Sequence, residues 1–189
     1  YRIPGLYESI FVDLFQGISH RIVPKKLKEV LDEDRVAPAI LRCIDFGSGV
    51  GLAVEELVEI GLSSPLGIDI SPAAKAAALR DRGALYHDYL VADMTSPDAA
   101  TLAAITTFEA NCLICVSSLN VIPSVAFATL FNSLPIGAYM ALNVLSGALD
   151  ENPATGDLNG SNALIRHLLV SGAAQLRSNQ RYAHRMNSA

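Results

Sequence analysis

The sequence predicts an α/β fold, in which helices cover both faces of a doubly wound, mostly parallel β-sheet. Short apolar runs with the length of buried strands alternate with segments of helical period. Glycine or proline separates most of these segments. A chain of 189 residues suits one domain with a sizeable core, so we treat residues 1–189 as a single domain.

Residues 1–36 are predicted to form a helical cap ahead of the sheet. In the first part of this segment, an apolar side chain recurs every four residues at Leu6, Ile10, Leu14 and Ile18. This spacing predicts an amphipathic helix with those side chains on its buried face. We expect a second short helix to begin at Pro24, because proline favours the first turn of a helix.

Residues 37–149 are predicted to form the core of the sheet. We expect strands over residues 40–46, 66–70, 89–92, 112–116 and 139–145. We expect helices over residues 52–60, 72–82, 97–107 and 124–134. Helices that alternate with strands at this spacing indicate βαβ units. Ligands of such sheets bind at the carboxyl ends of the strands, where the strand order reverses.

Residues 150–189 are predicted to contain a polar loop, a helix and a further strand. Ser161 is suited to cap the helix, and Gly172 to end it. Residues 175–185 are expected to form a sixth strand.

Charge is distributed unevenly along the chain. Its 14 basic and 19 acidic residues give a net charge of −5, which disfavours a nucleic-acid partner. None of them falls between Ala110 and Leu149. Prolines and many Ser and Asn residues interrupt this block, so we predict buried strands and no membrane span. The uncharged helix over 124–134 is expected to pack against a second copy, as a homodimer, or against the missing C-terminal segment.

The three cysteines, Cys43, Cys112 and Cys115, all lie in apolar runs. Cys112 and Cys115 form a C-x-x-C pair, but positions i and i+3 of a strand face opposite sides of a sheet. We therefore predict buried free thiols, no metal site and a reducing, cytoplasmic location.

The first strand ends in an acid and a glycine-rich turn, from Asp45 through Gly47, Ser48 and Gly49 to Gly51. Glycines allow a tight turn and a close approach of the backbone to a ligand. The dinucleotide pattern G-x-G-x-x-G/A fails here, because its last position is Leu52.

The next two strands also end in acids. Asp69 ends the second strand, where a carboxylate can accept hydrogen bonds from a ribose diol. Asp93 and Met94 end the third, where they could meet an exocyclic amine and an apolar ring.

Together these motifs, over residues 40–145, resemble a class I S-adenosylmethionine-dependent methyltransferase, which has a Rossmann-like fold. The resemblance implies S-adenosyl-L-methionine as cofactor. It implies cofactor contacts at Asp45, Gly47, Ser48, Gly49, Asp69, Ile70, Asp93 and Met94, and at Val116 and Ser117 after the fourth strand. Residues 83–89 also resemble small-molecule-type members. Three of these acids have alternative roles: Asp45 could orient the loop, Asp69 could cap a helix and Asp93 could form an Asx turn.

The implied activity is in-line methyl transfer to a small-molecule or protein acceptor, for which orientation supplies much of the rate. The catalytic residue is not identified by the sequence. Candidates on the acceptor side are Tyr7, His20, Ser118 and Asn120. A surface location is the alternative for His20, and a turn role before Pro123 is the alternative for Asn120. Asn120 follows a Ser-Ser-Leu stretch, not the Asp/Asn-Pro-Pro motif of nucleic-acid amine methylases.

Two other functions remain open at this stage. One is a non-catalytic member of the fold that binds the cofactor or a partner protein, and the other is an NAD(P)-dependent oxidoreductase. Class I methyltransferases usually end with an antiparallel pair of strands, and this sequence offers at most a sixth strand. We therefore expect the last strand to be missing, and the natural chain to extend beyond Tyr1 and Ala189.

Overall fold

The computed structural model describes residues 1, 3–144 and 159–184. Its sheet consists of β1 (Cys43–Phe46), β2 (Leu66–Asp69), β3 (Asp88–Val91), β4 (Cys112–Cys115) and β5 (Tyr139–Leu142). All five strands are parallel, in the order β3-β2-β1-β4-β5. The strand order therefore reverses between β1 and β4, which confirms the predicted doubly wound sheet and the five core strands.

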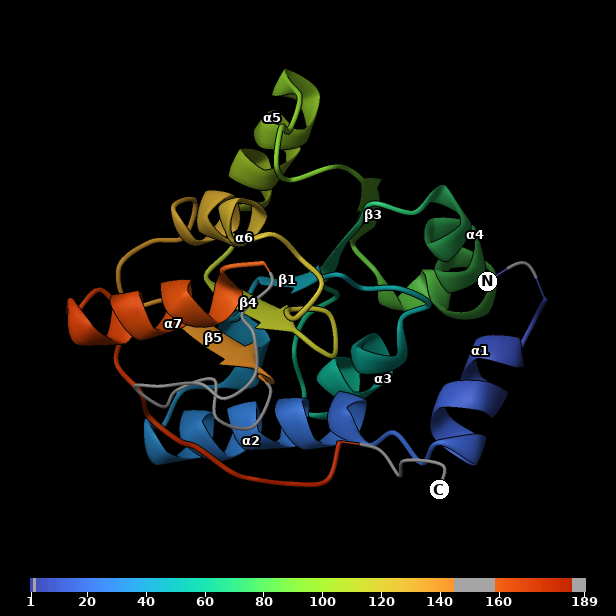
Figure 1. The fold of residues 1–189 in the computed structure, drawn as a ribbon, viewed down its shortest axis with the longest axis horizontal. Coiled ribbons are helices and arrows are strands. Elements are labelled where there is room, and N and C mark those ends of the chain that lie inside the picture. The colour runs from blue at the N-terminus through green and yellow to red at the C-terminus, as the bar shows by residue number, and fades with distance from the viewer. Residues whose placement is uncertain (2, 145–158, 185–189) are drawn as a thin grey trace.

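Helices cover both faces of this sheet (Figure 1). They are α2 (Ser19–Glu33), α3 (Leu52–Glu59), α4 (Pro72–Arg82), α5 (Ala99–Phe108), α6 (Ser124–Phe131) and α7 (Ser161–Val170), with short 3₁₀ helices at Pro38–Ile40 and Gly83–Leu85. Side chains of α2 and α3 form one core cluster with β1 and β4. Side chains of α5, α6 and α7 form another on the opposite face. None of the helices that the structure describes is long and apolar enough to cross a membrane.

The three cysteines are free and fully buried. Cys43 and Cys112 are register partners and lie in the cluster beneath α2, whereas Cys115 lies in the opposite cluster. The two thiols of the C-x-x-C pair therefore face opposite sides of the sheet, as predicted.

The prediction that Leu6, Ile10 and Leu14 form the buried face of the first helix is wrong. The segment forms α1 (Leu6–Glu8) and then a π-helix over Ser9–Leu14, in which the Phe15 amide donates to the Ile10 carbonyl. Side chains four residues apart still share a face in this wider winding, but the face that carries Leu6, Ile10 and Leu14 points outward. Leu6, Ile10 and Leu14 are consequently exposed, Leu14 at 69%, whereas Ile18 is half-buried. The rings of Tyr7 and Phe11 face inward instead, and they stack with centroids 5.5 Å apart.

Helix α2 begins five residues earlier than predicted, at Ser19, so Pro24 lies inside it. Burial of Val23, Pro24 and Leu27 on one face of the helix offsets the single hydrogen bond that proline cannot donate.

The predicted sixth strand is also wrong for the part of residues 175–185 that the structure describes. This C-terminal strap (residues 173–184) runs along α2 (Figure 1). Arg177 pairs with Asp34, just past the end of α2, and the His184 carbonyl accepts from the Ile18 amide at 3.3 Å. Arg177, Tyr182 and His184 of the strap thus bond to the cap, and β5 is the edge strand among the described residues.

Helix α7 explains part of the uncharged surface of α6. Ile165 and Leu168 of α7 share a core cluster with Phe127 and Leu130 of α6. The amide of Ser124 donates to the carbonyl of Asn159 at 2.9 Å. A segment of the same chain therefore covers one side of this helix.

Gly67, in the middle of β2, is packed against two buried tyrosine rings. A Cβ at this position would lie 2.7 Å from Cδ2 of Tyr89 and 2.9 Å from Cε1 of Tyr86. Gly67→Ala is therefore expected to destabilise the fold by about 1–3 kcal/mol through overpacking. Urea unfolding measures this change. In the matched control Gly83→Ala, the nearest atom is 3.9 Å away and the effect should stay within about 0.5 kcal/mol. Equal unfolding midpoints for the two variants would contradict the assigned packing.

Candidate functional site

A cavity of about 340 Å³ lies at the carboxyl ends of the strands, at the point where the strand order reverses. We call it the smaller cavity. All ten residues assigned to the cofactor line it: Asp45, Gly47, Ser48, Gly49, Asp69, Ile70, Asp93, Met94, Val116 and Ser117. Tyr7, His20 and Ser118 line it as well, whereas Asn120 does not. The structure thus brings together residues from four strand ends and from the cap.

The glycine turn between β1 and α3 has a backbone conformation that would be strained for most residues other than glycine. Gly47, Gly49 and Gly51 have φ values of 71°, 55° and 87°, in the left-handed region that favours glycine. The nearest heavy atom to a Cβ on Gly49 would be 3.8 Å away. The turn therefore leaves its backbone open toward the cavity at Gly49.

Asp69 joins the ends of β1 and β2. Its Oδ2 accepts from the Gly49 amide at 2.9 Å, and its Oδ1 accepts from the Ser71 amide at 2.8 Å. Ser71 caps α4 with its own hydroxyl, which accepts from the Ala74 amide. Because each carboxylate oxygen can accept more than one hydrogen bond, Asp69 keeps capacity for a ligand diol while it fixes the loop.

Asp45 is buried beneath the glycine turn, with 1% of its surface exposed. The Ser48 hydroxyl donates to Asp45 Oδ2 at 2.7 Å and also lies 2.7 Å from the Tyr86 hydroxyl. Burial raises the pKa of Asp45 to about 6, the Ser48 hydrogen bond opposes that rise, and the nearby charge of Asp69 adds to it. This geometry favours the alternative in which Asp45 orients the loop.

Two tyrosines that the sequence analysis did not select also brace the glycine turn. The Tyr89 hydroxyl donates to the Gly49 carbonyl at 2.8 Å, and the Tyr86 hydroxyl meets Ser48. Their rings pack edge to face, with centroids 5.3 Å apart, over the space that Gly67 leaves open. A buried tyrosine hydroxyl needs a hydrogen-bond partner. Two tyrosines at the start of a predicted strand were therefore the sequence feature that could have indicated this bracing role.

Asp93 forms an Asx turn, which is the alternative role that the sequence allows for it. Its Oδ1 accepts from the amide of Thr95 at 2.9 Å and from the Thr95 hydroxyl at 2.7 Å, and these bonds lower its pKa. Its Oδ2 receives no hydrogen bond from the described residues. Met94 belongs to the core and is 2% exposed, whereas Ile70 is 67% exposed at the rim. Ile70 is thus better placed than Met94 to cover a ring.

Arg82, which carried no recognisable sequence signal, ties the cap to the glycine turn. Its guanidinium pairs with Glu8 of the cap at 3.0 Å and with Glu55 of α3 at 2.9 Å. It also donates to the Val50 carbonyl at 3.3 Å. Tyr1, Tyr7 and Phe11 of the cap then line the cavity.

The loop after β4 positions two serines differently. Ser117 has a φ of 61°, which is unusual for a residue other than glycine, and its amide donates to Asn143 Oδ1 at 2.6 Å. The Ser118 hydroxyl lies 3.1 Å from the carbonyls of Gly47 and Val116. Ser118 therefore holds the two loops together, and its hydroxyl is already engaged.

His20 is buried, not on the surface, with 6% of its area exposed at the start of α2. Its Nδ1 has no hydrogen-bond partner among the described residues. Burial lowers the pKa of His20, and the positive charges of Arg21 and Arg82 lower it further. The imidazole is thus held neutral at pH 7, with an unsatisfied nitrogen beside the cavity.

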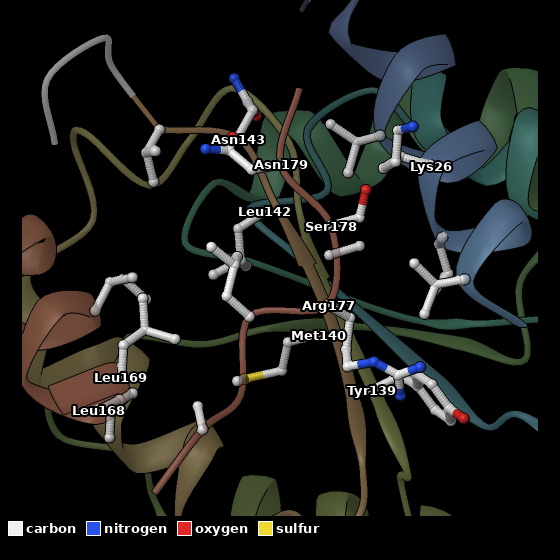
Figure 2. A pocket seen from close by; sticks show the side chains of 18 of the residues that line it. Lys26, Tyr139, Met140, Leu142, Asn143, Leu168, Leu169, Arg177, Ser178 and Asn179 are labelled. Carbon is white, nitrogen blue, oxygen red and sulfur yellow. The ribbon is translucent and has the colours of Figure 1, made fainter. Parts of the chain in front are cut away.

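A larger cavity, of about 1350 Å³, lies between β5, α2, α7 and the C-terminal strap. Figure 2 shows Arg177, Ser178 and Asn179 of the strap crossing β5, with Leu168 and Leu169 on one side. Asn120 lines this cavity. The two cavities share Phe11, Ser117 and Val121 as lining residues.

Comparisons with known proteins identify the fold. No protein-family model and no curated protein matches the sequence. Among solved structures, the chain is similar to the SAM-bound amino pentose methyltransferase CalS10 from Micromonospora echinaspora, with a TM-score of 0.56 and 18% identity over 74% of this chain and 56% of that one. It is similar to DesVI from Streptomyces venezuelae, with a TM-score of 0.54 and 11% identity over 77% of this chain and 59% of that one.

The sugar N-methyltransferase KedS8 from Streptoalloteichus sp ATCC 53650 is similar at a TM-score of 0.50 and 22% identity, over 67% of this chain and 49% of that one. The chain thus spans about half the length of the structures that it resembles. An open, all-parallel sheet with helices on both faces agrees with these matches, and the chain has the class I methyltransferase fold.

Proposed function

We propose that this chain is an S-adenosylmethionine-dependent methyltransferase that acts on a small-molecule acceptor. The observation that carries the proposal is the charge of the smaller cavity. Its charged lining residues among the described part of the chain are Asp45, Asp69 and Asp93, with neither Lys nor Arg. Carboxylates suit the hydroxyls and amine of a nucleoside and the positive charge of a sulfonium. They disfavour the phosphates of a nicotinamide dinucleotide.

The proposed residue roles follow from this arrangement. Asp69 would accept hydrogen bonds from the ribose hydroxyls, and Asp93 Oδ2 would accept one from the adenine amine. Asp45 would keep the glycine turn in place for the methionine part. When bound, the cofactor supplies an electrophilic methyl group on its sulfonium. The aromatic rings of Tyr7 and Phe11 would exclude water from the site.

The likeness in fold to an amino pentose methyltransferase and a sugar N-methyltransferase supports a small-molecule acceptor over a protein. We also propose a cytoplasmic location, which the three free thiols support, because thiols stay reduced there.

Titration calorimetry of the full chain tests the cofactor. We expect S-adenosylmethionine and S-adenosylhomocysteine to bind and to raise the melting temperature, while NAD and NADP do neither. A response to NADP without one to S-adenosylhomocysteine would overturn the proposal in favour of an oxidoreductase. Binding without methyl transfer to any member of a metabolite extract would instead indicate a non-catalytic member of the fold.

A further inference from the structure

The lining of the smaller cavity includes two residues with a buried polar atom that has no hydrogen-bond partner among the described residues. These atoms are Nδ1 of His20 and Oγ of Ser117. An unsatisfied buried polar atom costs about 1–3 kcal/mol, and such atoms are rare in folded proteins. Both residues line the smaller cavity, so a ligand group bound there is a candidate partner for both atoms.

Ser117 is held in place by the end of β5. Asn143 accepts its amide proton at 2.6 Å, which fixes the left-handed backbone of Ser117. Ser117 lines both cavities, whereas His20 lines the smaller one. Strained backbone of this kind is concentrated at functional sites. A ligand that bonds with both atoms lies in the smaller cavity, and Ser117 places it next to the larger one.

The lining of the larger cavity constrains the rest of that ligand. Met140 and Leu142 of β5 and Leu168 and Leu169 of α7 give it an apolar side, opposite Lys26 of α2 (Figure 2). Every charged residue in its described lining is basic: Lys26, Arg177 and Arg181. Lys26 pairs with Glu29 and Arg177 pairs with Asp34, but Arg181 has no ion-pair partner among the described residues. An apolar body that is neutral or anionic suits this cavity, and an ammonium group does not.

We propose, on the basis of the proposed function, that the methyl acceptor is an acidic hydroxyl compound, a phenol or an enol. Its hydroxyl is held by His20 and Ser117, and its neutral or anionic body occupies the larger cavity. A neutral imidazole matches the acidity of such a hydroxyl more closely than that of an alcohol.

The hydroxyl proton passes to Nδ1 of His20, and the oxygen lone pair forms the new bond to the methyl carbon. The carbon–sulfur bond breaks, and its electron pair stays on sulfur as a neutral thioether. His20 leaves the step as an imidazolium and returns its proton to solvent, while Ser117 Oγ donates a hydrogen bond to the acceptor oxygen.

Binding to the chain saturated with S-adenosylhomocysteine tests this assignment without turnover. Four probes vary one feature at a time: 4-hydroxyphenylacetate, neutral 4-methylphenol, cationic tyramine, and phenylacetate, which lacks the hydroxyl. We expect tyramine and phenylacetate each to bind at least about tenfold more weakly than 4-hydroxyphenylacetate. The ¹⁵N signal of His20 Nδ1 should shift with the phenols and not with phenylacetate.

Substitutions at His20 and Ser117 test whether these two side chains, and not the fold as a whole, create the preference for a hydroxyl. In His20→Phe and Ser117→Ala, each saturated with S-adenosylhomocysteine, the preference for 4-hydroxyphenylacetate over phenylacetate should fall to about threefold or less. The control Ser133→Ala, at the end of α6, should keep the full preference. Equal binding of tyramine and 4-hydroxyphenylacetate, a preference that survives both substitutions, or no binding of any probe at millimolar concentration would overturn the assignment. Failure to bind S-adenosylhomocysteine would instead count against the proposed function.

Discussion

Replacing Asp69 with alanine is expected to weaken the binding of S-adenosylhomocysteine by at least about 100-fold. Two effects combine in this variant. The ribose hydroxyls lose a charged acceptor, and a hydrogen bond to a charged group is worth about 1.5–3 kcal/mol. The amides of Gly49 and Ser71 also lose the carboxylate that fixes the loop. Titration calorimetry measures the affinity, and urea unfolding verifies that the variant is folded.

Asp69→Asn refines this test, because it keeps one accepting oxygen and replaces the other by a donor. We expect an affinity between those of the wild type and the alanine variant. Asp98→Ala is the matched control. It removes a carboxylate that caps α5 through the Thr101 amide and does not line the smaller cavity, so binding should be unchanged. An affinity of Asp69→Ala within about threefold of the wild type would contradict the ribose assignment.

Asp45→Asn is expected to stabilise the ligand-free protein at neutral pH by up to about 3 kcal/mol. Burial raises the pKa of Asp45 from 3.8 to about 6, so the folded state binds more protons than the unfolded state between these values. The contribution of Asp45 to stability is therefore full below pH 3.8, falls as the pH rises to about 6, and stays low above it. The neutral amide avoids this loss and can still accept from Ser48.

Urea unfolding of both proteins between pH 4 and pH 8 isolates this contribution, because the other carboxylates cancel in the difference. The gain from Asp45→Asn should grow up to about pH 6 and then level off. Asp98→Asn gives the opposite sign, since the Thr101 amide lowers the pKa of Asp98 and its contribution is lost as the pH falls. A stability difference for Asp45→Asn that does not vary with pH would show that its carboxyl is not desolvated.

The sheet and the strand-end acids were predictable because they depend on local sequence. Apolar runs bounded by turns located all five core strands, and parallel strands bring their carboxyl ends to one edge. Asp69 and Asp93 therefore reached the same cavity. The bracing of that cavity was not predictable, because Tyr89 and Arg82 meet the glycine turn from 32 to 40 residues away. Spacing along the chain contains no information about such contacts.

Two errors have a related origin. The four-residue spacing of Leu6, Ile10 and Leu14 placed them on one helical face, but spacing does not decide which face is buried, and the rings of Tyr7 and Phe11 occupy the inner one. An extended backbone over residues 175–184 is compatible with a strand, but it forms a strand only where it pairs with a neighbouring one. Arg177 and Tyr182 bond to residues at the two ends of α2, not to the edge of β5.

The three buried cysteines give this sheet internal reporters of its own opening. Burial raises the pKa of Cys43 and of Cys115, and the thiolate is the form that a labelling reagent attacks. Native protein should therefore resist alkylation until the sheet exposes a thiol. Cys43 faces α2 and Cys115 faces α6, so the labelling rates of these two positions time the detachment of the two helical layers separately.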